Sequence, residues 1–359
     1  MDFCLNDDQR LLQEQLDIAL SRVSPLARVR RHADADGEFP GDVWAALTEF
    51  GLPGVLIPCE FGGLGMAVLD AALLSEVLGR HAVPVPFFGA AVAAPLAILG
   101  AGSKTQQAQL LPQIAAGKLR MAVAMSEILA GARRGDGVEV QGGKLYGTTH
   151  FAVDILGAHE ILVADSAGGL HRVDADAPGL TVTPLVIVDR THSAAALTFN
   201  SVTAERLEGT TPGVSKRIAM ALQVTAAADL LGAGTRMLEM AVEYAKVRRQ
   251  FGRPIGSFQA VKHLCADMAA ELEPGRALMW YAAHAQDVAL PDAALAVLHA
   301  KAYLADAARI AARNSIEVHG GIGITDELGL HFWFKRVTFC GQLFGGSTRM
   351  RELAALEPR

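Results

Sequence analysis

Two glycine-rich segments are the first places in this sequence where chemistry could occur. "GGIGIT" (320–325) could hold a nucleotide phosphate only if it joined a strand to a helix, and the residues before it carry a helical pattern. A helix C-cap is therefore the favoured interpretation of these glycines. The second segment, "CGQLFGGSTRM" (340–350), also follows a predicted helix. It is either a helix stop or a loop from which a catalytic residue is missing.

Metal and nucleophile signatures are absent from the sequence. The four cysteines lie far apart and form no metal-binding spacing: Cys4, Cys59, Cys265 and Cys340. We interpret them as buried free thiols in a reducing compartment. The sequence contains no Walker A motif and no GxSxG motif, so we predict no metal site, no P-loop and no serine-hydrolase elbow.

One acidic residue stands out because it interrupts an apolar helical pattern. Asp229 lies in "AADLLGAG", where an unpaired carboxylate would be costly to bury. It is either a displaced catalytic base or an acid paired with an arginine.

The elements around these residues change character twice along the chain. Residues 1–118 predict an N-terminal α-helical domain, residues 119–212 carry short alternating runs typical of a β domain, and residues 213–359 return to long helices. "VEVQGGKLYG" predicts a hairpin turning at Gly142-Gly143. The fold class is therefore α+β, with a middle β-barrel or sandwich between two helical domains, the last a four-helix bundle.

Composition limits the possible partners. With 51% hydrophobic residues, 19% charged residues and a net charge of −6, the chain shows no electrostatic footprint for nucleic acid. The acidic N-terminus is unlike a signal peptide, and the alanine-rich stretch 85–101 is interrupted by Gly and Pro. We expect a cytoplasmic protein that does not bind nucleic acid or a membrane.

Four segments together resemble one family, the acyl-CoA dehydrogenases. They occur in the order and spacing of that family over essentially the whole chain: "IPCEFGGLGM" (57–66), "AMSEILAG" (124–131), "RRQFGRPIGSFQAVKHLCADM" (248–268) and "EVHGGIGITDELGLHFWFKR" (317–336). The resemblance implies the α–β–α fold expected above. It also implies an FAD-dependent α,β-desaturation of an acyl-CoA thioester, with electrons passed to an electron-transfer flavoprotein.

The same resemblance implies which residues contact FAD. The adenine and pyrophosphate end would be held by C-terminal residues that reach across a subunit interface: Arg248, Gln250, Phe251, Gln259, Gly320, Gly321 and Gly323. Arginine suits a pyrophosphate because its guanidinium donates two parallel hydrogen bonds. On the flavin side, Met125, Ser126 and Phe151 are the implied contacts. Val153 stands where the family has a threonine, so the hydroxyl group there is lost.

The base implied by the resemblance is missing. Gly345 occupies the position where the family usually has a glutamate, and Leu222 occupies the alternative position on the first long C-terminal helix. The loop "AGSD" of the family becomes Ala130-Gly131-Ala132-Arg133. Gly345 would still offer a backbone N–H toward a thioester.

The leading hypothesis is a base-less subunit that completes the FAD site of a base-bearing partner. It resembles subunits of bacterial α2β2 heterotetramers of steroid side-chain catabolism, which makes a steroid-CoA a candidate substrate. Two alternatives stay open. One is a self-sufficient homo-oligomeric flavoenzyme with a displaced base such as Asp229, or one that uses its flavin for oxygen chemistry. The other is a structural or binding paralogue without FAD. The acyl chain and the partner's identity are not determined by the sequence.

Overall fold

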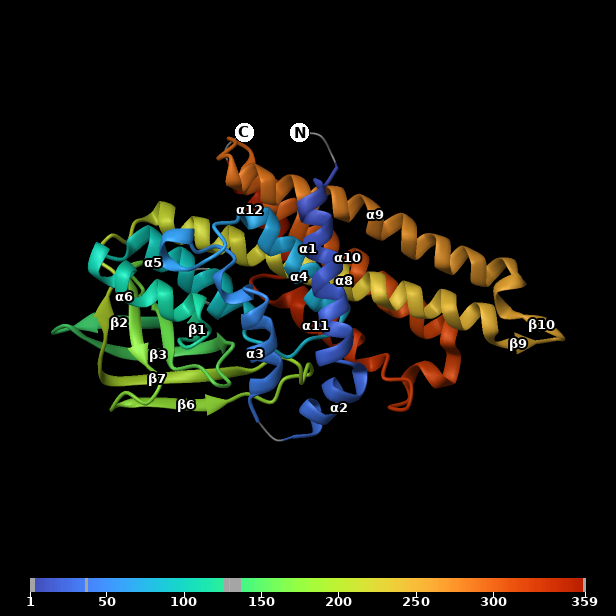
Figure 1. Cartoon of the computed structure of the whole chain (residues 1–359), viewed down its shortest axis with the longest axis horizontal. Helices are drawn as coiled ribbons and strands as arrows, with labels where there is room; N and C mark the ends of the chain where they lie inside the picture. Colours follow the sequence, from blue (N-terminus) through green and yellow to red (C-terminus); the bar gives the residue numbers. More distant parts are fainter. Residues whose placement is uncertain (1–3, 36–37, 126–128, 130–136, 358–359) are drawn as a thin grey trace. The chain divides into compact units, whose positions relative to one another are not determined.

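A computed structural model describes residues 4–35, 38–125, 129 and 137–357. These residues form two compact units. Unit 1 combines residues 1–34, 72–83 and 223–359, and unit 2 combines residues 35–71 and 84–222. The α+β class and the succession of helices, sheet and helices are confirmed, while the three domains 1–118, 119–212 and 213–359 stay a prediction (Figure 1).

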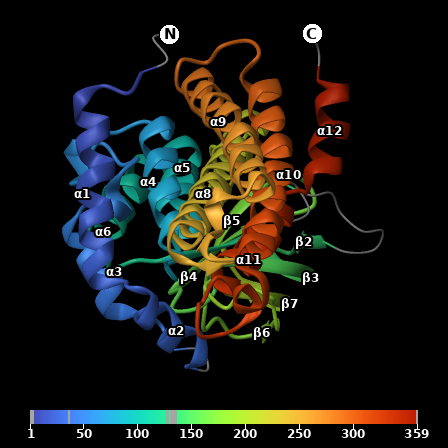
Figure 2. The same cartoon turned by 90° about the vertical axis from the view of Figure 1, so that its right-hand side faces the viewer.

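Unit 1 is helical. Its helices, of which α4 and α8 begin in unit 2, are α1 (Asp7–Val23), α2 (Leu26–Asp34), α4 (Val68–Arg80), α8 (Pro212–Val247), α9 (Gln259–Asp287), α10 (Ala293–His319), α11 (His331–Gln342) and α12 (Ser347–Leu356). Figure 2 shows α9 and α10 side by side, with α12 alongside α10. The small residues of α10 allow this close packing, because Ala300, Ala307 and Ala311 are all buried in it.

Helix α8 is the longest element of the chain. Among the described residues it alone is long and apolar enough to cross a membrane, but 83% of its most apolar 18-residue window is buried. That burial is typical of the core helix of a folded protein. Beyond α8, the short strands β9 (Arg249–Gln250) and β10 (Arg253–Pro254) form a hairpin at the ends of the long helices (Figure 1).

Unit 2 contains a sheet of eight strands and several short helices. The strands are β1 (Met121–Ala124), β2 (Gly137–Gln141), β3 (Lys144–Val153), β4 (Glu160–Ala164), β5 (Leu170–Asp174), β6 (Leu180–Pro184), β7 (Ala194–Thr203) and β8 (Glu205–Arg206). Their order is β6-β7-β3-β1-β4-β5-β8, β2 pairs with β3, and only the β1–β4 pair is parallel. The short helices are α3 (Gly41–Glu49), α5 (Ala94–Ala101), α6 (Lys104–Ala115) and a π-helix, η3 (Phe88–Ala93).

The predicted hairpin is confirmed. Gln141 pairs with Lys144 across Gly142 and Gly143, whose φ angles of 58° and 78° are those that a two-residue type I′ turn requires. The sheet packs around alternating apolar side chains such as Val138, Leu145 and Leu197, and this alternation is the pattern that the sequence showed.

Candidate active site

The loop after α11 occupies the place where a catalytic base was expected. Gly345 has φ +106° and is buried, and the preceding Phe344 has φ +59°. Such angles favour glycine, so the backbone here follows a path that a glutamate would adopt only with strain. The Gly345 N–H donates to the carbonyl oxygen of Gln342 at 3.1 Å. The expected thioester donor is therefore already bonded within the chain.

The alternative base position also carries no acid. Leu222 is fully buried in α8. Seven residues further along α8, Asp229 is the nearest acid in that helix. Asp229 binds Arg336 of α11 through two bonds, with Nε–Oδ1 at 2.8 Å and Nη2–Oδ2 at 2.7 Å. Abstracting a proton would require Asp229 to leave this pair, so the geometry favours the arginine-paired interpretation over that of a displaced base.

Most residues expected at the adenine end of FAD lie exposed on unit 1. Arg248, Gln250 and Gln259 are exposed, and Phe251 shows 92% of its surface. A phenylalanine side chain that stays so exposed gains almost no hydrophobic stabilisation when its own chain folds. Its ring meets that of Phe258 edge-on at 6.0 Å. The group is thus turned outward, as residues that bind something outside the unit would be.

The FAD contacts expected at the adenine end lie on two segments, one around Arg248 and the other around Gly320. These segments meet where α8 and α10 end. Tyr244 lies in the last turn of α8, just before Arg248, and its ring stacks on that of His319 with centroids 4.8 Å apart. His319 ends α10 and directly precedes Gly320. Its Nδ1 bonds the Ser315 carbonyl at 2.7 Å, and burial lowers its pKa. The stacking therefore brings the arginine segment and the glycine loop together within unit 1.

The three glycines of that loop have different surroundings. A Cβ atom added at Gly320 or Gly321 would meet nothing within 4 Å, so space is free for a ligand to approach the backbone. Gly323 is buried, and a Cβ atom there would lie 3.0 Å from His319 Cβ and 3.1 Å from the Ile316 carbonyl oxygen. Gly323 is thus required for packing within the chain, which the sequence pattern did not distinguish from a ligand contact.

The flavin-side residues belong to unit 2. Met125 is buried directly after β1, and Phe151 is half-buried in β3. Val123 of β1 pairs with Val153 of β3, so the two expected contacts lie next to the same pair of strands. Ser126 and the loop 130–133 lie outside the described residues.

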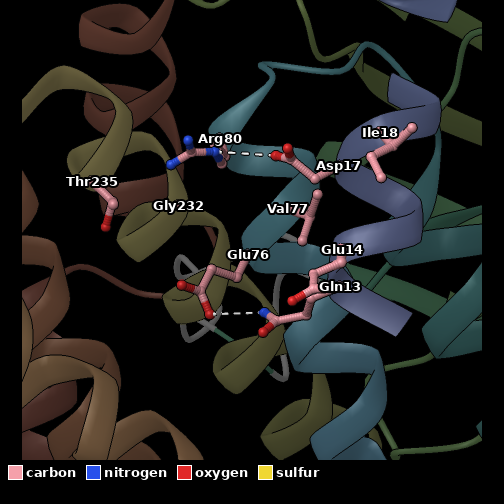
Figure 3. A pocket seen from close by; sticks show the side chains of 9 residues that line it. All are labelled: Gln13, Glu14, Asp17, Ile18, Glu76, Val77, Arg80, Gly232 and Thr235. Atoms are coloured by element: carbon pink, nitrogen blue, oxygen red, sulfur yellow. Dashed lines mark hydrogen bonds and ion pairs between the residues drawn. The ribbon is translucent and has the colours of Figure 1, made fainter. Parts of the chain in front are cut away.

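A separate cavity of about 410 Å³ lies in unit 1 between α1, α4 and α8 (Figure 3). None of the described residues that are expected to bind FAD or substrate lines it. Arg80 pairs with Asp17 at 3.2 Å and with Glu239, and the buried Glu76 pairs with Arg276. Burial raises the pKa of Glu76, although Arg276 opposes the shift. These charges are engaged with one another, so the cavity is bordered by an ion-pair network.

Known proteins match this chain along most of its length. The sequence profile of the acyl-CoA dehydrogenase N-terminal domain matches residues 6–118, and that of the C-terminal domain matches residues 216–355. Acyl-CoA dehydrogenase IpdE2 of Mycobacterium tuberculosis is 33% identical over 94% of this chain and 93% of its own length.

The chain belongs to the acyl-CoA dehydrogenase family.

Members of this family are FAD-dependent oxidoreductases that act on acyl-CoA, so the predicted enzyme class is confirmed. Two solved structures of acyl-CoA dehydrogenase type resemble the chain over nearly its full length. A variant of the Tcur3481–Tcur3483 steroid ACAD is 30% identical, with a TM-score of 0.89 and 97% of both chains covered. One chain of the ChsE4–ChsE5 complex from Mycobacterium tuberculosis is 26% identical, with a TM-score of 0.90, and the match covers 99% of this chain and 98% of that one.

Proposed function

We propose that this chain is the base-less subunit of a heteromeric, FAD-dependent acyl-CoA dehydrogenase. The observation that carries the proposal is an asymmetry between the two ends of the expected cofactor. The adenine-side group is kept and points outward, with Phe251 92% exposed. The base position holds Gly345 in a left-handed conformation. Such a chain can bind part of a cofactor without performing the proton abstraction itself.

The residues present suit the adenine and pyrophosphate of FAD. Arg248 would bind the pyrophosphate through charge-assisted hydrogen bonds, and the free space at Gly320 and Gly321 admits a ligand close to the backbone. Gln250 and Gln259 would bind nearby polar groups, and Phe251 would cover the adenine ring. When bound, FAD supplies the acceptor for the hydride that leaves the substrate.

The other half of the reaction would come from a partner subunit. A base-bearing acyl-CoA dehydrogenase would supply the carboxylate for the α-proton, and an electron-transfer flavoprotein would reoxidise the flavin. The similarity to a steroid ACAD favours a bulky steroid-type acyl-CoA as the substrate. The ChsE4–ChsE5 complex supports a two-chain assembly, because this chain resembles one chain of that complex over nearly the full length.

The experiment compares the chain alone with the chain co-expressed with a base-bearing acyl-CoA dehydrogenase encoded beside it. We expect a colourless, inactive protein alone, and flavin absorbance with dehydrogenase activity in the complex. Stoichiometric FAD and activity in the isolated chain would instead identify a self-sufficient flavoenzyme. A complex that forms without FAD would identify a structural paralogue.

Arg248→Ala in this chain tests cofactor donation directly. A charged hydrogen bond contributes about 1.5–3 kcal/mol, so FAD retention in the complex should weaken by roughly 10- to 100-fold. Arg22→Ala is the matched control, because Arg22 is also an exposed arginine at the end of a long helix. Unchanged flavin content in the Arg248→Ala complex would reject donation by this residue.

A further inference from the structure

Polar contacts join α8 to α10 close to the point where both helices end. Ser315 Oγ of α10 donates to the Met237 carbonyl of α8 at 2.8 Å, and both residues are fully buried. One turn further along α10, the helix ends at His319, which is only 4% exposed. The ring of His319 interacts with the Met240 carbonyl of α8. The contact between the two helices therefore continues to the last residue of α10.

His319 lies between the arginine segment and the glycine loop. Its ring stacks on that of Tyr244, with centroids 4.8 Å apart and planes 29° apart. Its Nδ1 bonds the Ser315 carbonyl at 2.7 Å, which fixes the orientation of the ring. The glycine loop folds back onto the same residue, because a Cβ atom at Gly323 would lie 3.0 Å from His319 Cβ. His319 thus contacts the last turn of α8 and the glycine loop at once.

Tyr244 connects this contact to Arg248 through the backbone. The Arg248 N–H donates to the Tyr244 carbonyl at 2.9 Å, and the Ile255 N–H donates to the Arg248 carbonyl at 2.8 Å. The Arg248 side chain is exposed, so its location depends on the backbone that carries it. A displacement of Tyr244 would therefore move Arg248 relative to the glycine loop.

We propose that His319 is a positioning residue, which holds the Arg248 segment at a fixed distance from the glycine loop so that both can contact the pyrophosphate of one FAD. The inference rests on the proposed function, since it takes these two segments as the site for the adenine end of FAD. His319 acts through Tyr244 and stays buried beneath the site. A ligand that needs two segments at once binds more tightly when their spacing is fixed beforehand, because less conformational freedom is lost on binding.

The test is a double-mutant cycle on FAD affinity, measured by flavin fluorescence during titration of the flavin-depleted complex with its base-bearing partner. His319→Leu removes both the ring stacking and the bond to the Ser315 carbonyl. It should weaken FAD binding by about tenfold in the otherwise wild-type chain and by no more than about threefold in the Arg248→Ala chain, since residues that act together are not additive.

Ser315→Ala is the matched control. It removes the Ser315–Met237 hydrogen bond, which joins the same two helices one turn further from the glycine loop. Both variants loosen the contact between α8 and α10, but only His319→Leu does so where the two FAD-binding segments meet. Ser315→Ala should keep FAD affinity within about twofold of wild type and preserve the full effect of Arg248→Ala.

Equal losses from His319→Leu in the wild-type and Arg248→Ala chains would overturn the proposal, because His319 would then act independently of Arg248. A loss in Ser315→Ala as large as that in His319→Leu would overturn it too. If His319→Leu does not fold, Tyr244→Leu removes the same stacking from α8 and should give the same pattern. Unchanged FAD affinity in Tyr244→Leu would equally reject the role. Failure of the proposed function is a separate result, since it appears as unchanged flavin content after Arg248→Ala alone.

Discussion

Asp229 and Arg336 form a buried ion pair in which two guanidinium nitrogens each bond one carboxylate oxygen, at 2.8 and 2.7 Å. Their side chains are only 2% and 3% exposed. Arg336 also donates from Nη1 to the Val83 carbonyl at 3.1 Å. The pair therefore ties α8 to α11 and to the chain just after α4, all within unit 1. A carboxylate held in this way is a structural element of the helical unit.

Asp229→Asn tests this role. It leaves the Arg336 charge buried without a counter-ion, which costs about 3–5 kcal/mol of the free energy of unfolding. Urea denaturation of the isolated chain measures the loss. Asp17→Asn is the control, because its 43% exposed carboxylate, which pairs with Arg80 and bonds His81, should contribute about 1 kcal/mol or less. Equal losses in the two variants would contradict the structural role of Asp229.

Gly345→Glu asks whether restoring the family's residue restores a base. The backbone φ of +106° disfavours any L side chain, and a Cβ atom would lie 2.3 Å from Met350 Cε. We expect about 1–3 kcal/mol of destabilisation and no dehydrogenase activity in the isolated chain. Gly345→Ala should show most of the same loss, since the conformation rather than the carboxylate causes it. Activity in the isolated glutamate variant would refute this account.

His319 predicts a pH dependence of stability. Burial lowers its pKa below the usual 6.5, although bonds to the Ser315 and Met240 carbonyls oppose the shift. The unfolded chain then binds a proton at His319 more readily than the folded chain does. The free energy of unfolding therefore has its full value, as far as His319 is concerned, above about pH 7. This contribution is lost as the pH falls through 6.5 toward the lower folded-state pKa. Urea unfolding from pH 7.5 to 5 should show a steeper loss in wild type than in His319→Gln, and parallel slopes would contradict the assignment.

The sequence predicted the succession of elements well because periodicity and turn chemistry are local. The hairpin at Gly142-Gly143 and the long helices after residue 213 follow from such local signals. The π-helix η3 could not be predicted, because its residues are all buried and show no alternation of polar and apolar side chains.

The candidate site was predictable only in part. The sequence indicated that Asp229 needed a partner, but Arg336 lies 107 residues away along the chain. The stacking of His319 on Tyr244 was missed, because the two residues lie on different helices and no local pattern pairs them. Long-range pairing of this kind is decided by packing and is not encoded in residue spacing.

Replacing Gly232 of α8 with alanine should destabilise the protein, which is opposite to the usual effect of this change in a helix. Alanine ordinarily stabilises a helix relative to glycine by about 1 kcal/mol. At Gly232, however, a Cβ atom would lie 1.8 Å from the Glu76 carbonyl oxygen and 2.8 Å from Arg80 N, which are backbone atoms of α4. Because backbone cannot rotate away as a side chain can, Gly232→Ala must separate α4 from α8 beside the cavity in Figure 3.

We expect Gly232→Ala to lower the free energy of unfolding by about 1–3 kcal/mol, in the range of overpacked cores. Gly213→Ala is the matched control at the start of the same helix. A Cβ atom there would meet only Thr211 Oγ1 at 3.7 Å, so the change should be neutral or stabilising by up to about 1 kcal/mol. Urea unfolding of both variants decides the point. If Gly232→Ala is as stable as Gly213→Ala, α4 and α8 do not approach as closely as the structure shows. Only close backbone contact between them would make the two substitutions change the free energy of unfolding in opposite directions.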